Sequence, residues 1–419
     1  MRLSSLLLIS LLSGAAYADD AQKSDADWDF KSQAVFYYQT ADNWGNGQLF
    51  DQGPSGDNEG WAAATAGIQF IGENKDLFGG LGVGFELNGL SNLGLDDSVV
   101  SGMPQRAHED PDGNGAALSR AYLTYGISNT KFKYGRQHLP KGLSPFAFTE
   151  GWNVFKNSFE GLLVVNTDIK DTTVVLASVA KHNNSVGDIS EFTDFHTAKG
   201  DVGLLTVQNK SFGDLTLTGS YYWIPDAVWA NGGYATDADA LWLDASFKLK
   251  NGTSGAIQGG KIGGLSLAGA EDTTAFGAKV AGKFGDVNWS FAVSSTDDGT
   301  LNVANLAGTG VKTPLFTQSV LNQNAIKRDS ESFKFTLSTK VYEGKFTFAY
   351  TASNLGDTAL PTVFGQGVGG DGKYSEFDFI YVKNFTKELK VFFGLISQYD
   401  DRQADEDQNL FRVWARYNF

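Results

Sequence analysis

Segments whose side chains alternate between apolar and polar recur along the whole chain, and this period of two constrains the fold most. In one of them Leu241, Leu243 and Phe247 alternate with polar neighbours, and the C-terminal segment 411–419 alternates in the same way. Successive side chains of a strand point to opposite faces, so each segment predicts a strand with one apolar and one polar face. We expect eighteen such strands, at 33–40, 61–71, 79–90, 117–127, 130–138, 159–166, 172–180, 201–209, 214–223, 239–250, 255–268, 274–283, 287–295, 331–339, 344–353, 374–383, 388–398 and 409–419.

The links between these segments alternate between short and long. Ser128 and Asn129 alone separate one pair of strands, whereas 91–116, 139–158 and 296–330 are long links. Short turns at one end and long loops at the other are typical of an outer-membrane β-barrel, which meets lipid outside and water inside. A soluble sandwich gives this alternation in about seven to nine strands, and it rarely gives eighteen.

The sequence therefore predicts an all-β fold, a transmembrane antiparallel β-barrel of eighteen strands. Segment 255–268 is rich in glycine and only partly periodic, and without it and its hairpin partner the barrel would have sixteen strands. The chain holds 50 glycines, which suit barrel corners and crowded walls, and no cysteine. Without disulfides, hydrogen bonds and burial must hold the barrel together.

The first 18 residues predict a secretory signal peptide, which leaves 19–419 as a single barrel domain. A basic residue, Arg2, precedes the apolar run Leu6–Leu12, and Ala16-Tyr17-Ala18 offers a small-x-small cleavage site. No later run of about 18 apolar residues could form a transmembrane helix. Export of a barrel predicts a location in the bacterial outer membrane. The net charge of -15 argues against a nucleic-acid partner, which requires a basic face.

The long link 139–158 is too apolar for a loop in water. It holds two prolines and four large aromatic side chains but few charges. We expect this third external loop to fold into the lumen as a constriction; the alternative is packing on a neighbouring subunit or on other loops. The candidate constriction residues are Pro140, Lys141, Pro145, Phe146, Phe148, Glu150, Trp152 and Lys156.

Around this loop the sequence resembles a known family. Ala121-Tyr122-Leu123, then Lys133-Tyr134-Gly135-Arg136-Gln137 with Pro140, then Phe159-Glu160-Gly161 resemble the outer membrane porin D (OprD) type of substrate-selective porin. The resemblance implies eighteen strands, a third loop that narrows the pore, and a ladder of basic residues that guides anionic groups. Arg136 has the lipid-facing parity of Phe132, so it must lie beyond the hydrocarbon band or follow a bulge. The ladder residues with lumen parity are Arg120, Lys131, Lys133, Arg412 and Arg416.

Charges on the polar face of the strands predict electrostatic selection. Basic groups on one wall and acidic groups on the other create a transverse field that can orient a zwitterionic or carboxylate solute. The alternatives are that the charges only solvate a wide channel, or that the closing-strand arginines pair with acids. The basic candidates are Arg120, Lys131, Lys133, Lys334, Arg412 and Arg416, and the acidic candidates are Glu86, Asp244, Glu376 and Asp378.

These features predict an outer-membrane porin, without cofactor or metal, for passive diffusion of small hydrophilic solutes. Its expected partners are outer-membrane lipid, lipopolysaccharide and two further copies in a homotrimer. The stretch Asp110–Asn114 lacks a full calcium loop, so a solvated acidic loop is favoured over a calcium site. No Gly-x-Ser-x-Gly motif or cysteine supports an enzyme. The alternative is a surface adhesin or structural barrel with a blocked lumen, in which 296–330 is the best candidate for cell-surface contact.

Overall fold

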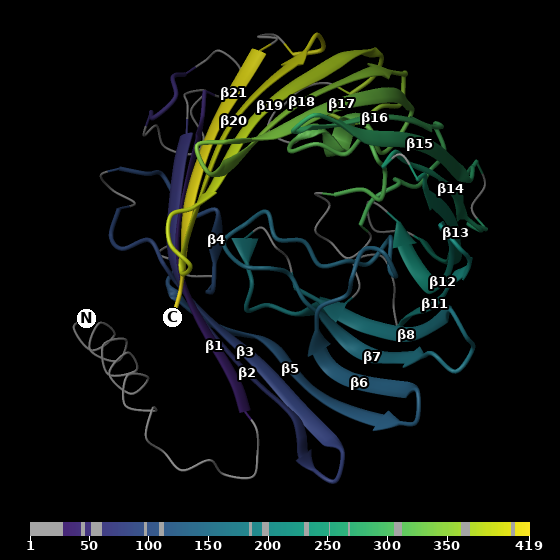
Figure 1. Ribbon diagram of the computed structural model, residues 1–419. Helices are drawn as coiled ribbons and strands as arrows, with labels where there is room; N and C mark the ends of the chain where they lie inside the picture. Colours follow the sequence, from purple (N-terminus) through teal and green to yellow (C-terminus); the bar gives the residue numbers. More distant parts are fainter. Residues whose placement is uncertain are drawn as a thin grey trace.

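The computed structural model describes residues 28–42, 47–51, 61–95, 99–108, 113–183, 187–194, 201–229, 234–250, 252–266, 269–305, 312–361, 369–403 and 407–419. Within them one sheet of 19 strands curls into a ring (Figure 1). One of the 19, β10 (Thr193–Asp194), has two residues, and the other eighteen form the barrel. These are β1 (Trp28–Ala41), β2 (Trp61–Phe78), β3 (Leu81–Ser91), β5 (Gly115–Ile127), β6 (Thr130–Gln137), β7 (Phe159–Asn166), β8 (Thr172–His182), β11 (Val202–Phe212), β12 (Leu215–Trp229), β13 (Tyr234–Lys248), β14 (Ser254–Gly263), β15 (Thr273–Phe284), β16 (Val287–Thr296), β17 (Ser330–Val341), β18 (Gly344–Leu355), β19 (Gly372–Asn384), β20 (Leu389–Asp400) and β21 (Asp407–Asn418).

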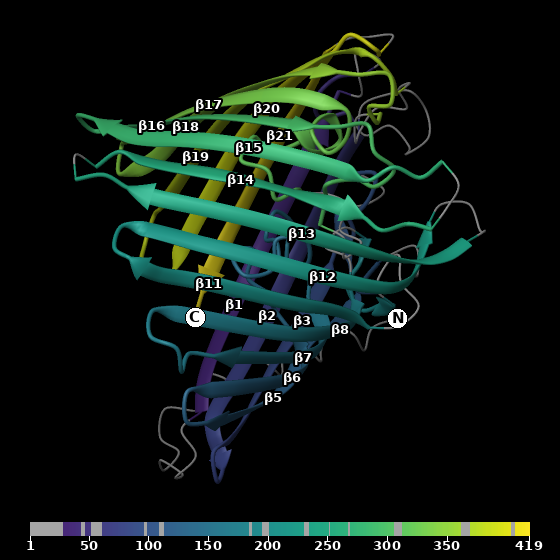
Figure 2. The same cartoon turned by 90° about the vertical axis from the view of Figure 1, so that its right-hand side faces the viewer.

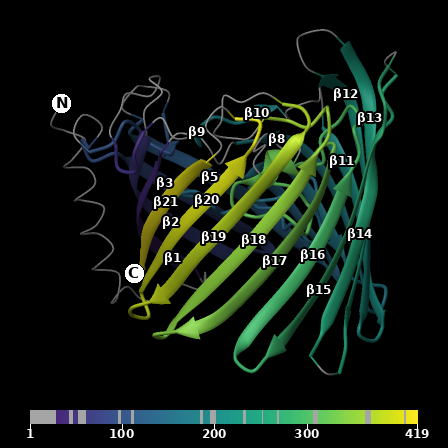
Figure 3. The same ribbon diagram turned by 90° about the horizontal axis from the view of Figure 1, so that it is seen from above.

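The barrel closes where the first strand pairs with the last. β1 and β21 are antiparallel, with Gln33 opposite Asn418 and Ala41 opposite Leu410. The strands slant across the barrel (Figure 2), and Figure 3 shows tight turns at one end and longer connections at the other. Closure leaves no sheet edge with unpaired backbone groups, which is the condition for a sheet to lie in lipid.

The predicted count of eighteen strands is confirmed, and the alternative of sixteen is wrong. The first part of the doubtful segment 255–268 lies in β14, which ends at Gly263 and pairs with β13 and with β15 along its length. The main boundary error is in β2, which continues to Phe78 because its ladder with β1 extends to the pair Trp28 and Asn74. The predicted signal peptide, residues 1–18, lies outside the described residues and stays a prediction.

The two faces of the sheet differ as the alternation predicts. On β19, Phe377 and Phe379 are 40% and 42% exposed on the outer face, whereas Glu376 and Asp378 are 0% and 2% exposed on the inner face. Many other large apolar side chains are exposed in the same way, among them Phe393 and Leu395 on β20. The buried core therefore lies inside the barrel, between the wall and segments that pack against it.

Three small elements complete the described structure. A two-residue parallel bridge joins β4 (Gln105–Arg106) to β9 (Gly187–Asp188), and a 3₁₀ helix, η2 (Asn322–Ala325), lies between β16 and β17. In the part of the chain that the structure describes, no helix has the length and apolar character needed to cross a membrane.

Candidate functional site

The segment 139–158, between β6 and β7, packs against the inner face of β12 and β13. Phe146 is fully buried, with its ring centroid 5.6 Å from that of Tyr222 and 5.3 Å from that of Trp242, both edge-on. The backbone N–H of Phe146 also donates to the Tyr222 hydroxyl at 3.1 Å. These contacts explain why the segment is rich in aromatic residues, since its apolar side chains pack against the wall and not against water.

The other part of the same segment contacts β20 and β21. Trp152 packs edge-on against Phe392, with 6.4 Å between ring centroids. The Arg416 guanidinium donates to the backbone carbonyls of Asn153 and Val154 at 3.1 and 2.9 Å. Residues 139–158 thus contact inward-facing side chains of two well-separated parts of the wall.

A second long segment, between β16 and β17, packs against the inner face of β19. The backbone N–H groups of Val320 and Leu321 donate to the Glu376 carboxylate at 2.8 and 3.0 Å, and the Ser319 hydroxyl donates to Asp378. Val320 and Leu321 are each only 4% exposed, so this part of 296–330 is not available for the cell-surface contact that the adhesin alternative would place there. Two acids predicted to line the pore instead anchor this segment.

The two segments are joined to each other. The Lys312 ammonium donates to the carbonyls of Ser319 and Val320 at 3.0 and 2.8 Å, and it lies 4.9 Å from the centre of the Trp152 ring. Lys141 donates to the Thr313 carbonyl at 2.7 Å. Burial removes hydration from the Lys312 ammonium and lowers the pKa of Lys312 to about 8. We call residues 139–158 and 312–326 the paired loops.

Beside the paired loops a cavity of about 700 Å³ extends along the wall. Four of the predicted site residues line it: Lys141, Pro145, Asp244 and Lys334. Lys279, on β15, lines it too and was missed, although it alternates with the exposed Phe276 and Val280 and therefore carried a signal. A further cavity of about 310 Å³ also includes Lys279 in its lining.

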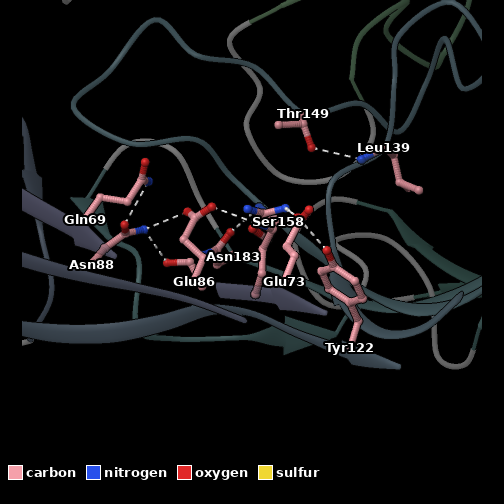
Figure 4. Close-up of polar contacts among 11 residues, drawn as sticks. Gln69, Glu73, Glu86, Asn88, Tyr122, Leu139, Thr149, Ser158 and Asn183 are labelled. Carbon is pink, nitrogen blue, oxygen red and sulfur yellow. Dashed lines mark hydrogen bonds and ion pairs between the residues drawn. The ribbon is translucent and has the colours of Figure 1, made fainter. Parts of the chain in front are cut away.

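The predicted residues on β3 and β5 form a polar cluster of their own (Figure 4). The Arg120 guanidinium donates to Glu86 at 2.7 Å and to Glu73 at 3.4 Å, and the Tyr122 hydroxyl donates to Glu73 at 2.7 Å. The Lys133 ammonium lies 3.6 Å from the centre of the Tyr122 ring. In this cluster Arg120 and Glu86 neutralise each other, so Arg120 contributes little net field to the lumen.

The closing-strand arginines are also engaged by neighbours. Arg412 donates to the Gln39 side chain at 2.9 Å and is 7% exposed, and Arg416 donates to the Gln33 side chain at 2.8 Å. Both point inward, as their parity predicts, but their partners are amides and loop carbonyls and not acids. We conclude that they position the loop and β1.

Five predicted residues remain. Lys131, Pro140 and Lys156 are exposed, whereas Phe148 and Glu150 are buried. Phe148 is also held to the segment between β16 and β17, since the Asn305 side-chain amide donates to the Phe148 carbonyl at 2.8 Å.

Arg136 lies on the outer parity, as expected for its position on β6. It forms an ion pair with Glu160 at 3.1 Å, and its guanidinium lies 4.0 Å from the centre of the Phe192 ring. Arg136 is one residue from the end of β6, which agrees with a place near the loop end of the barrel.

Potential metal-binding groups are sparse in this structure. Among the described residues, no group of three or more histidine, aspartate or glutamate side chains could hold a metal ion. The acidic stretch Asp110–Asn114 falls largely outside the described residues.

Comparison with known proteins supports the fold. No family model and no curated protein sequence matches the chain. Among solved structures it is similar to Pseudomonas aeruginosa OccK9 (OpdG), with a TM-score of 0.72, 14% identity, and coverage of 94% of this chain and 98% of that one. It is similar to Pseudomonas aeruginosa OccK8 (OprE), with a TM-score of 0.69, 16% identity, and coverage of 93% and 98%. It is also similar to Pseudomonas aeruginosa OccK2 (OpdF), solved in complex with glucuronate, with a TM-score of 0.68, 12% identity, and coverage of 94% and 98%.

Proposed function

We propose that this chain is a substrate-selective porin of the OprD type, in the bacterial outer membrane, for passive diffusion of small hydrophilic solutes. The observation that carries the proposal is a closed eighteen-stranded barrel whose interior holds a cavity of about 700 Å³ with charged lining. Such a barrel is wide enough for an aqueous passage, and only what packs inside it restricts that passage.

The outer face supports a lipid environment. Apolar side chains that are about two-fifths exposed, such as Phe377, Phe379 and Leu395, would aggregate in water but are stable against acyl chains. The closed strand ladder satisfies the backbone groups that lipid cannot. Lipopolysaccharide contact, a homotrimeric state and cleavage after residue 18 belong to the same proposal.

We propose that the paired loops form the constriction and that lysines beside them select solutes by charge. Lys141, Lys279 and Lys334 converge on the cavity, and Asp244 is the one acid among the described lining residues. An anionic solute that passes these ammonium groups recovers part of the hydration energy that it loses in a narrow lumen. Carboxylate or amino-acid-like solutes are therefore favoured. Arg120, Arg412 and Arg416 position other groups and play a smaller part in selection.

The adhesin alternative requires a blocked lumen. The cavity counts against a blocked lumen. The burial of residues 319–321 against the inner face of β19 counts against a cell-surface contact through this segment.

Planar-bilayer recording under a salt gradient tests this proposal. We expect stable conductance steps and a zero-current potential that indicates anion preference at the constriction. Replacing Lys279 and Lys334 together by glutamine should shift that potential toward cations, whereas the double variant of the exposed Lys131 and Lys340 should shift it less. A folded barrel without conductance steps would refute the porin, and an unchanged potential in the first variant would refute selection by these lysines.

A further inference from the structure

Two of the cavity lysines stand in one row across three strands. Lys279 on β15 pairs in register with Ala292 on β16, and Ala292 pairs in register with Lys334 on β17. Adjacent strands lie about 4.8 Å apart, so the two lysine α-carbons are about 10 Å apart. Ala292 carries only a methyl group and lines the cavity between the two strands that hold the lysines.

The positive charge of the cavity lysines is only partly neutralised by acidic groups in the cavity lining. Lys334 donates to the Gln318 carbonyl at 2.6 Å and Lys141 to the Thr313 carbonyl, so uncharged partners hold them in place. Lys279 forms no ion pair or hydrogen bond with any residue that the structure describes. Three ammonium groups against the carboxylate of Asp244 leave a formal charge of +2 in the described lining.

The nearest other acids, Glu376 and Asp378, are not among the residues that line the cavity. Glu376 and Asp378 face Lys334 from β19, but Ser319, Val320 and Leu321 lie over them and donate to their carboxylates. Asp244 pairs in register with Gln258, and Gln258 pairs with Gly277. Asp244 is therefore two strands away from Lys279 and offset from it by two residues along the strand, which is too far for an ion pair between the two side chains.

A buried donor also points to a ligand with acceptor oxygens. Gln258 lines the cavity and is 4% exposed, yet its amide nitrogen has no hydrogen-bond partner among the described residues. Buried polar groups without a partner are rare in folded proteins. A carboxylate held by Lys279 could accept from this amide, because Gln258 and Lys279 are on adjacent strands.

We propose that the cavity is a binding site for small dicarboxylates, with one carboxylate at Lys279 and the other at Lys334. This rests on the proposed porin function and adds the substrate class to it. Two separated ammonium groups suit two separated carboxylates better than they suit one compact anion. A dianion also matches the formal charge of +2, whereas a monocarboxylate leaves repulsion among the lysines uncompensated.

Succinate and butyrate test the proposal, because both have four carbons and they differ in the second carboxylate. Each is added to one side of a bilayer that contains single channels of the purified protein, and the fall in chloride conductance gives the half-blocking concentration. We expect succinate to block at a concentration about fivefold or more below that of butyrate, since one added charge pair at contact distance in water changes an equilibrium by about that factor. Inorganic phosphate is the third probe.

Lys279→Gln and Lys334→Gln should each remove the preference for succinate over butyrate. Lys340→Gln is the matched control, because Lys340 is on the same face of the same strand as Lys334 but is exposed and outside the cavity lining. Heat-modifiable mobility on gels verifies that each variant is a folded barrel.

Three results would overturn the dicarboxylate site while the porin stands. They are equal block by succinate and butyrate, block by phosphate as strong as by succinate, and an effect of Lys340→Gln as large as that of Lys279→Gln. Absence of conductance steps in the unmodified protein would instead refute the porin itself.

Discussion

Glu376 provides the sharpest test of the loop that connects β16 to β17 and packs against β19. Its buried carboxylate accepts from the N–H groups of Val320 and Leu321 and from the Tyr374 hydroxyl at 2.6 Å. A hydrogen bond to a charged group contributes about 1.5–3 kcal/mol and a neutral one about 0.5–1.5 kcal/mol. Glu376→Gln keeps the side-chain shape but removes the charge, and it should therefore weaken the two bonds to the loop by about 2 kcal/mol in total.

A loss of about 2 kcal/mol raises the fraction of time that the loop spends detached by about 30-fold. Because the loop lies beside the cavity, detachment should widen the passage and produce excursions to higher conductance. Single-channel recording measures the fraction of time in that state. Glu388→Gln is the control for loss of one negative charge, because Glu388 is exposed in the turn between β19 and β20. The reasoning is refuted if folded Glu376→Gln channels show no more such excursions than the control.

Three further predictions follow from single contacts. Phe146→Ala removes the ring that packs on Tyr222 and Trp242, so the contact between loop 139–158 and the wall should weaken by about 3–5 kcal/mol. The single-channel conductance should therefore rise. A conductance equal to that of the unmodified protein would contradict the anchoring role of Phe146. Burial in the attached loop lowers the pKa of Lys312 from 10.5 to about 8. Between these two pH values the detached state therefore binds more protons than the attached state. The free energy of loop attachment should become more favourable by about 1.4 kcal/mol per pH unit in that range. Conductance excursions should accordingly be rarer at pH 9.5 than at pH 7.5, and Lys312→Met should remove that part of the pH dependence. Gly135 has φ +115 and no room for a Cβ beside the Ala121 carbonyl, so Gly135→Ala should lower the yield of folded barrel on gels, and an unchanged yield would contradict this.

The barrel itself could be predicted because its determinants are local. A period of two is visible within one strand, and turn length is visible between two strands, so even the doubtful β14 was placed by its neighbours. The inward parity of Glu376 and Asp378 also followed from the alternation on β19. The alternation does not predict which inward-facing side chain contacts which loop.

The packing of the second loop could not be predicted, because it depends on non-local contacts. The sequence of residues 319–321 does not indicate that they contact Glu376, which lies more than 50 positions further along the chain. For the same reason Arg416 appeared as a free cation of a ladder, although the carbonyls of Asn153 and Val154 engage it. Lys279 is different: its parity on β15 was readable, and a systematic list of inward charges would have included it.

The central claim is that a solute can pass through this barrel beside the paired loops. Swelling of proteoliposomes in neutral polyols of increasing size tests it most directly, because it needs neither charge selectivity nor an identified substrate. We expect fast swelling with the smallest polyols, slower swelling as the solute approaches the size of the constriction, and a higher size limit in Phe146→Ala. No swelling above that of protein-free liposomes, from protein that is folded on gels, would contradict it.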